Sequence, residues 1–242
     1  MSKLFALVKR NLKETLREPL ALVFCLGFPL VMLVLMQLLF SNMPNVPDIF
    51  EIENYAVGIC VFGYTFVMLF TAMAISGDKN TEFINRLNLA PVNKATYLFS
   101  FVLSMLPVAL AQTVIFFAVS LIFGVELSVG LLVAIVYLLP SAVLYITFGV
   151  LLGVICKNEK QAGPISSIII SCTSILGGVF MPVDGMGIFT TINDFLPFTH
   201  SIKIASGALV GNLGCVIPHL YWVVGYIVAL WIINVLLYKR KR

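Results

Sequence analysis

Long runs of apolar residues alternate with short polar segments along the chain. Six runs are about as long as the roughly 20 apolar residues that a helix needs to cross a membrane, and none contains Asp, Glu, Lys or Arg. They lie at residues 20–40, 55–76, 97–123, 129–156, 164–181 and 218–238. Lipid offers no partner to a free backbone N–H or C=O, so each run is expected to be helical. The pattern predicts an all-α integral membrane protein with six transmembrane helices.

The segment before the first run has a pattern of its own. Within residues 2–18, Leu4, Val8, Leu12 and Leu16 repeat every four residues, and lysines and arginines occupy the other faces. Such an amphipathic helix is expected to lie along the membrane interface, with its apolar side toward the acyl chains and its basic side toward anionic headgroups. The alternative is that the basic residues act only as a topology signal.

The connection after the second run, residues 77–96, predicts one further helix. Thr81 is a suitable N-cap for a short helix over residues 82–88, and Pro91 would end it. The apolar side of this helix contains Phe83, Leu87 and Leu89, and its polar side contains Glu82, Arg86 and Asn88. A small amphipathic helix of this kind is a surface that a partner protein can bind. The alternative is the single helical turn that many membrane loops contain.

The connection between the last two runs is unusually apolar for its length. Its charged residues are Asp184, Asp194 and Lys203. A solvated loop over residues 181–217 would be far more polar. We therefore expect two re-entrant half-helices, at residues 188–196 and 201–209, that enter the outer leaflet packed against protein, because non-helical backbone at that depth must be buried in protein.

The composition agrees with a membrane protein. Hydrophobic residues make up 60% of the 242 positions and charged residues 11%, against about 25% charged residues in a soluble domain. So few charges cannot cover a soluble domain of this size, which argues against a water-soluble enzyme and against a disordered chain. The five cysteines show no spacing typical of metal ligands, so we expect them to pack as small apolar residues.

The few charged residues are distributed unevenly. Fourteen of the 15 Lys and Arg residues lie on one side of the six predicted spans, and only Lys203 lies on the other. The positive-inside rule places the basic side, with both termini, in the cytoplasm of a multi-pass protein of the cell membrane. This topology explains the basic face, so membrane lipids are expected as neighbours and nucleic acid is not expected as a partner.

Catalytic motifs are absent from the sequence. It has no G-x-x-x-x-G-K-[ST], H-E-x-x-H or G-x-S-x-G, so we expect no catalytic residue, no metal site and no cofactor bound by this chain. Ser76-Gly-Asp-Lys79 matches S-x-x-K without its companion motifs, and chance explains it better. The apolar runs also lack the ionisable residues that a proton- or sodium-driven carrier uses. Energy for any transport is therefore expected from another subunit.

Two of the runs contain side chains suited to a substrate path. The fifth run is short and rich in hydroxyl and glycine residues, which face protein or a cavity rather than lipid. The second run contains a stripe of aromatic residues, for which simple packing is the alternative. The candidate path residues are Phe62, Phe66, Phe70, Ser167, Ser171 and Ser174.

The most specific pattern follows the fifth run. Gly177-Gly-Val-Phe-Met-Pro182 is followed by Leu196-Pro-Phe-Thr-His200 and then by Lys203. This order is similar to the G-x-x-[FY]-P … L-P-[LF]-[TS]-[HY] signature of the membrane subunits of type-2 ABC exporters, a family that includes antibiotic-resistance and polysaccharide-export permeases. The matching positions in the outer segment are Gly178, Pro182, Pro197 and His200. With its length, its six runs and its amphipathic N-terminal segment, the whole chain, residues 1–242, resembles a single permease domain of that family.

The resemblance implies an assembly. It implies a homodimer, or a dimer with a homologous permease, bound to two separate ABC ATP-binding subunits that hold ATP and Mg²⁺. Residues 2–18 would be a connecting helix, residues 77–96 would carry the main coupling helix, and the loop after the fourth run would be a second coupling site. The residues that would contact the ATP-binding subunit are Thr81, Glu82, Phe83, Arg86, Leu87, Pro91, Lys157 and Lys160.

These features predict the permease subunit of an ATP-driven exporter, not an enzyme, with an amphiphilic antibiotic, peptide or lipid-like molecule as substrate. Two other classes stay open. One is a six-span channel or scramblase that needs no ATPase, and the other is an immunity or sensor protein that binds a membrane peptide without transporting it. A neighbouring gene for a lone ATP-binding subunit would favour the exporter.

Overall fold

The computed structural model describes residues 3–40, 43, 46–89, 92–180 and 187–240, and within them every regular element is a helix. In chain order the elements are α1 (Lys3–Arg17), α2 (Pro19–Leu22), the π-helical turn η1 (Val23–Gly27), α3 (Phe28–Phe40), the 3₁₀ turn η2 (Asp48–Phe50), α4 (Ile52–Asp78), α5 (Glu82–Leu89), α6 (Lys94–Ile122), α7 (Val129–Ile155), α8 (Glu159–Leu176), α9 (Ile188–Phe195), α10 (Pro197–Leu209) and α11 (Leu213–Arg240). The prediction of an all-α protein is confirmed for these residues.

Five helical segments are long and apolar enough to cross a membrane. They are Pro19–Phe40, which joins α2, η1 and α3, together with α4, α6, α7 and the Leu213–Tyr238 part of α11. The predicted span at residues 164–181 corresponds to α8, which has 18 residues and is not among the five. Its helix begins earlier than predicted because the Asn158 side chain caps it, accepting a hydrogen bond from the Gln161 N–H at 3.1 Å. The six-span count is therefore not confirmed.

The long helix α4 forms the centre of the bundle. It is the most buried of the five segments, and α3, α6, α7, α8 and α10 all pack against it. Two glycines let α7 approach α4 closely. A Cβ atom added at Gly149 would lie 2.4 Å from the Met68 carbonyl oxygen, and one at Gly153 would lie 2.7 Å from Cβ of Ile75. The small-xxx-small spacing on α7 is thus used for close helix packing.

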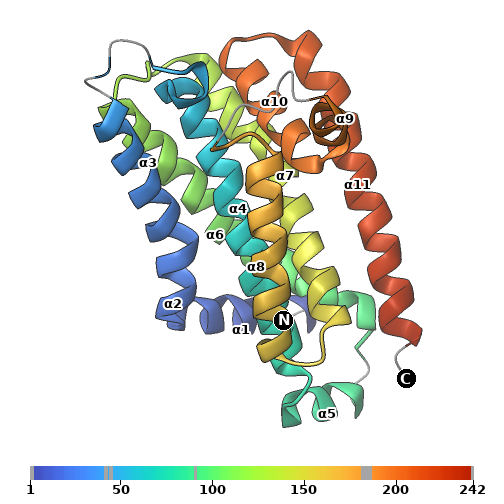
Figure 1. The fold of residues 1–242 in the computed structure, drawn as a ribbon. Coiled ribbons are helices and arrows are strands. Elements are labelled where there is room, and N and C mark those ends of the chain that lie inside the picture. The colour runs from blue at the N-terminus through green and yellow to red at the C-terminus, as the bar shows by residue number, and fades with distance from the viewer. Residues whose placement is uncertain (1–2, 41–42, 44–45, 90–91, 181–186, 241–242) are drawn as a thin grey trace.

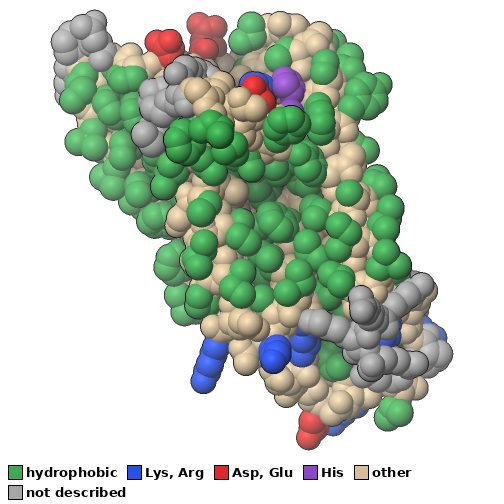
Figure 2. All heavy atoms as spheres, turned by 45° about the vertical axis from the view of Figure 1, so that its right-hand side comes forward, with side chains coloured by type: hydrophobic (Ala, Val, Ile, Leu, Met, Phe, Trp, Pro, Cys, Tyr) green, Lys and Arg blue, Asp and Glu red, His purple; other side chains and the backbone are tan. Residues whose placement is uncertain are grey.

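The two ends of the bundle differ in structure (Figure 1). Helix α1 lies across one end, where α5 and the last turn of α11 are also found, and α9 and α10 lie at the opposite end. Figure 2 shows a band of hydrophobic side chains between these ends, and Lys and Arg side chains gather at the end that carries α1 and α5. Such a band is the surface that a membrane protein presents to lipid.

Two local features refine the sequence-based picture. The first span contains a π-helical turn, Val23–Gly27, where an uninterrupted α-helix was expected. The outer segment contains two short helices as predicted, although α10 begins earlier, at Pro197, the residue best suited to a first helical turn. The re-entrant position of these two helices stays a prediction.

Candidate functional site

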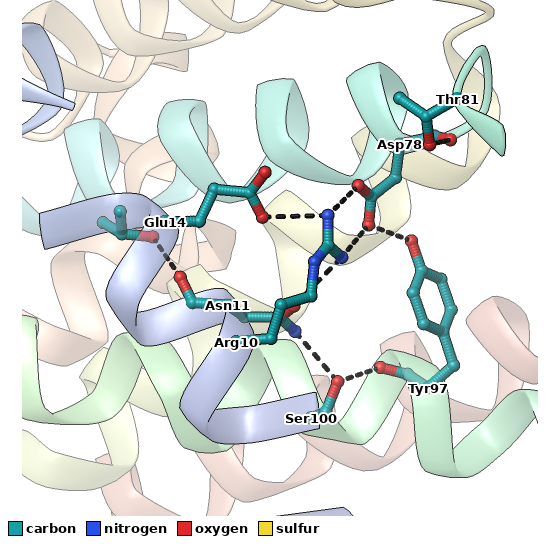
Figure 3. Close-up of polar contacts among 8 residues, drawn as sticks. Arg10, Asn11, Glu14, Asp78, Thr81, Tyr97 and Ser100 are labelled. Carbon is teal, nitrogen blue, oxygen red and sulfur yellow. Dashed lines mark hydrogen bonds and ion pairs between the residues drawn. The ribbon is translucent and has the colours of Figure 1, made fainter. Parts of the chain in front are cut away.

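A network of charged and polar side chains joins the helices at the α1 end of the bundle (Figure 3). The Arg10 guanidinium donates to both carboxylate oxygens of Asp78, the last residue of α4, at 2.7 and 2.6 Å. Burial disfavours the Arg10 cation, but the hydrogen bonds and charge of Asp78 outweigh this effect and raise the pKa of Arg10. Glu14 adds an ion pair to Arg10 at 2.9 Å. A two-pronged contact of this kind fixes both distance and orientation.

The same network fastens α1 to α6. The Tyr97 hydroxyl donates to Asp78 Oδ2 at 2.9 Å, and the Asn11 amide donates to the Ser100 hydroxyl at 3.0 Å. Asp78, Asn11 and Ser100 are all buried. One carboxylate therefore joins α1, α4 and α6.

Lys79, the next residue, fastens the end of α7. Its ammonium group donates to the carbonyl oxygens of Gly153, Val154 and Cys156 at 2.6, 2.8 and 2.5 Å. The last carbonyls of a helix have no partner within the helix, and a cation also complements the negative end of the helix dipole. We call Arg10, Asp78, Lys79 and Tyr97 the Asp78 junction.

Helix α5 follows the Asp78 junction in the chain and is in direct contact with it. The Thr81 hydroxyl donates to the Asp78 carbonyl at 2.7 Å, and the Arg10 guanidinium lies over the Phe83 ring, 3.8 Å from its centre. Leu87 also packs toward the core. The amphipathic character predicted for this helix is confirmed for Phe83 and Leu87, which are turned toward the bundle. The prediction is wrong for Leu89, because the period of 3.6 residues places it on the exposed side with Glu82 and Arg86.

The outward side of α5 is left open. The side chains of Glu82 and Arg86 are 85% and 80% exposed and form an ion pair of 3.3 Å across one helical turn. Leu89, at the end of α5, is 89% exposed. Two charges and a large apolar side chain on one exposed face form a surface that a partner could cover.

The second predicted contact segment lies next to α5. Lys157, in the loop before α8, and Lys160, in its first turn, are exposed, and the Asn80 amide donates to the Lys157 carbonyl at 3.4 Å. This contact places the segment that leads into α5 beside the loop that contains Lys157. Pro91 lies outside the described residues.

The candidate path residues fall into two groups. Phe62, Phe66 and Phe70 are buried on α4, beneath the rings of Phe24 and Phe28 from the first span. The closest of these ring pairs, Phe28 and Phe66, has centres 5.5 Å apart. The aromatic stripe is thus a packed wall of rings within one chain.

The hydroxyl residues of α8 behave differently. Ser167 and Ser171 are exposed, whereas Ser174 is buried. Ser167 donates to the Gly163 carbonyl and Ser171 to the Ser167 carbonyl, both at 3.0 Å within the helix. An exposed row of small hydroxyl side chains lets another helix approach closely.

The signature residues lie at the far end of the bundle. Gly178 has a φ of +75°, a conformation that favours glycine, directly after α8. Pro197 opens α10, and His200 on the same helix faces His219 of α11, with 2.9 Å between their Nδ1 atoms. Pro182 lies outside the described residues.

The Asp78 junction was not recognised in the sequence. The basic side of α1 was expected to face headgroups, but the buried face of α1 contains Leu7, Asn11 and Thr15, and Arg10 turns into the protein beside it. One sequence signal for this junction was available. The charged pair Asp78-Lys79 closely follows an apolar run, and charged side chains at such a position can serve as partners for the free carbonyl groups at helix ends.

Comparison with known proteins adds an independent finding. Residues 2–210 match the family model described as ABC-2 type transporter. The chain is also 28% identical over 221 residues to a protein of Cyanophora paradoxa described as transport permease ycf38, with 84% of this chain and 72% of that protein covered.

Proposed function

Because the chain belongs to the ABC-2 type transporter family, we propose that it is the permease subunit of an ATP-driven exporter and that α5 is its docking helix for a separate ABC ATP-binding subunit. The observation that supports this most is the position of α5. Its outward face is free, and its inward face is attached through Asp78, Arg10 and Phe83 to α4 and α1.

A displacement of α5 would reach several helices at once. Asp78 holds α1 and α6, and the neighbouring Lys79 holds the end of α7. An ATPase can drive a permease only by binding one of its conformations more tightly than the other. The Asp78 junction is the route by which that preference would spread from the docking helix into the bundle.

The substrate path would form between two permease chains. Helices α3 and α8 both pack against α4, which contains the aromatic wall, and Ser167 and Ser171 are exposed on α8. A second copy, or a homologous permease, would cover these faces and place the path between the chains. Aromatic and hydroxyl side chains together suit an amphiphilic antibiotic, peptide or lipid-like molecule.

The remaining parts of the proposal concern topology. Six spans would follow if α8 and the outer helices complete the bundle in the membrane. The basic end, with both termini, would face the cytoplasm under the positive-inside rule. ATP and Mg²⁺ would be bound by the partner, and α5 would meet it on that side.

The docking proposal is tested by co-purification. The tagged permease is co-expressed with a candidate ABC ATP-binding subunit from the same genome, and bound subunit is quantified for the wild type, Glu82→Lys and Arg86→Glu. We expect each reversal to lower the yield of bound subunit at least fivefold. Glu126→Lys is the matched control because it reverses an exposed glutamate in the turn that follows α6. Equal yields for all four proteins would contradict docking at α5.

A further inference from the structure

Two histidines from different helices meet at the end of the bundle remote from the Asp78 junction. His200 lies on α10 and His219 on α11, and their Nδ1 atoms are 2.9 Å apart. Figure 2 shows histidine side chains at the surface there, beside a Lys or Arg and an acidic side chain. Neither the docking surface nor the proposed path uses this pair.

The two rings differ in exposure. His200 is only 4% exposed and is stacked on the Trp222 ring, with ring centres 5.3 Å apart and planes 6° apart. This stacking fixes the direction of its Nδ1 atom. His219 is partly exposed. One ring of the pair is thus buried and held by stacking, and the other reaches the surface of the protein.

Burial, followed by the neighbouring His219 and Lys203, lowers the pKa of His200 to about 4, and the nearby Asp194 carboxylate only partly opposes this shift. A neutral imidazole has a lone pair on one ring nitrogen, and this is the form that binds a metal ion. In the hydrogen-bonded pair, one of the two Nδ1 atoms must carry the proton.

The distance between the nitrogens suits a shared metal ligand. Imidazole nitrogens bind Zn²⁺ at about 2.0–2.1 Å in tetrahedral geometry, which places two ligand nitrogens roughly 3.3 Å apart. To admit the ion, the two nitrogens would have to separate by a few tenths of an ångström, and the rings would have to turn so that both lone pairs point at it. The one Nδ1 proton would move to Nε2 of the same ring, so no proton is lost overall.

We propose that His200 and His219 form a binding site for a transition-metal ion, Zn²⁺, that joins α10 to α11. Among the described residues no group of three or more His, Cys, Asp or Glu side chains is arranged to hold a metal, so the described protein ligands would be the two imidazoles, with water in the other positions. Imidazole also binds Cu²⁺ and Ni²⁺, and Cu²⁺ would bind more tightly.

Two neighbouring charged residues change the affinity of this site for a cation in opposite directions. Lys203 donates to the Asp194 carboxylate at 3.2 Å, and both charges act on the His200 ring. Lys203 disfavours a second cation, and Asp194 favours one. We therefore expect Lys203→Ala to tighten Zn²⁺ binding and Asp194→Asn to weaken it, each by a few-fold.

The site is tested on the full chain, purified in detergent with its affinity tag removed, because a polyhistidine tag binds the same ions. Zn²⁺ is titrated against the protein at pH 7.5 by isothermal calorimetry, and the thermal midpoint is recorded with Zn²⁺ and with a chelator. We expect one Zn²⁺ per chain and a raised midpoint. His219→Gln, which keeps a hydrogen-bonding side chain, should weaken binding at least tenfold and abolish the shift of the midpoint.

Two further variants make the test specific. Cys215→Ser removes the thiol one helical turn before His219 and should leave Zn²⁺ binding unchanged. His200→Asn should weaken binding as His219→Gln does. Absence of Zn²⁺ binding by the wild type, or equal binding by His219→Gln, would overturn the proposal. The readout is binding alone, so this outcome is independent of whether the chain is a permease.

Discussion

The Arg10 guanidinium donates two hydrogen bonds, of 2.7 and 2.6 Å, to the carboxylate of Asp78, and this pair ties the N-terminal helix α1 to the end of the central helix α4. The contact joins residues 68 positions apart in the sequence, so it forms only when α1 packs against the end of α4. Its position above α5 makes it the structural link between the proposed docking helix and the bundle.

The first prediction concerns this ion pair. Asp78→Ala leaves the half-buried Arg10 cation without its main partner and should cost about 3 kcal/mol, in the range measured when one member of a buried pair is removed. Arg10→Ala should cost a similar amount, and the double variant should cost less than the sum of the two. Glu14→Gln is the control, because the Glu14 side chain is 61% exposed and its pair should contribute little. Thermal midpoints of the four variants check this, and strictly additive effects would contradict a direct coupling.

The second prediction concerns Lys79. Lys79→Met keeps the length of the side chain but removes the three hydrogen bonds to the last carbonyls of α7. We expect faster amide hydrogen exchange in the last turn of α7 and in the loop that follows, with the first half of α7 unchanged. Lys157→Met, at an exposed lysine in that loop, is the control. Unchanged exchange in Lys79→Met would show that the cap does not hold the end of α7.

The third prediction concerns the contact between α4 and α7. Gly149→Ala places a Cβ atom 2.4 Å from the Met68 carbonyl oxygen, so the helices must separate. Overpacking of this kind costs typically about 1–3 kcal/mol. Gly225→Ala is the matched control, because a Cβ atom at this helical position meets no neighbouring atom within 4 Å. The control should be neutral or slightly stabilising, since alanine favours helix over glycine. Equal thermal midpoints for the two variants would contradict the close approach.

The fourth prediction concerns pH. The pKa of His200 is lowered from its ordinary value near 6.5 to about 4, so between these values the unfolded chain binds more protons than the folded one. Stability should therefore be highest above about pH 6.5 and fall as the pH decreases toward 4. His200→Asn should flatten this part of the profile when thermal midpoints are measured with a chelator present. A variant profile as steep as that of the wild type would assign the effect to other groups.

Much of the fold was predictable because the position of a membrane-spanning helix can be predicted from the length and polarity of the apolar run that forms it. The apolar runs at residues 55–76, 97–123 and 129–156 agree with α4, α6 and α7 to within a few residues at each end. The short helix α5 was predicted from Thr81, the alternation of polar and apolar residues and Pro91, and only its last residue differed. These signals are local, so a single sequence contains them.

The features that the sequence did not predict depend mostly on contacts between distant segments of the chain. Arg10 looked like any other basic residue of an interfacial helix, and only the assembled bundle brings it to Asp78. The helix α8 was placed too late because its polar first turn, which Asn158 caps, does not belong to an apolar run. The π-helical turn in the first span likewise has no clear sequence signal, since Val23–Gly27 is as apolar as its neighbours.

Under the proposed function, this chain moves its substrate only when a separate ATP-binding subunit is bound to α5 and hydrolyses ATP. The most direct measurement reconstitutes the permease in proteoliposomes with and without that subunit, and follows a fluorescent short-chain phospholipid and a fluorescent amphipathic peptide after ATP is added. We predict flux of at least one probe that requires both the subunit and hydrolysable ATP, and that Glu82→Lys abolishes while Glu126→Lys does not. Full flux of a probe through the permease alone, without the subunit or ATP, would rule out transport driven by an ATP-binding subunit at α5.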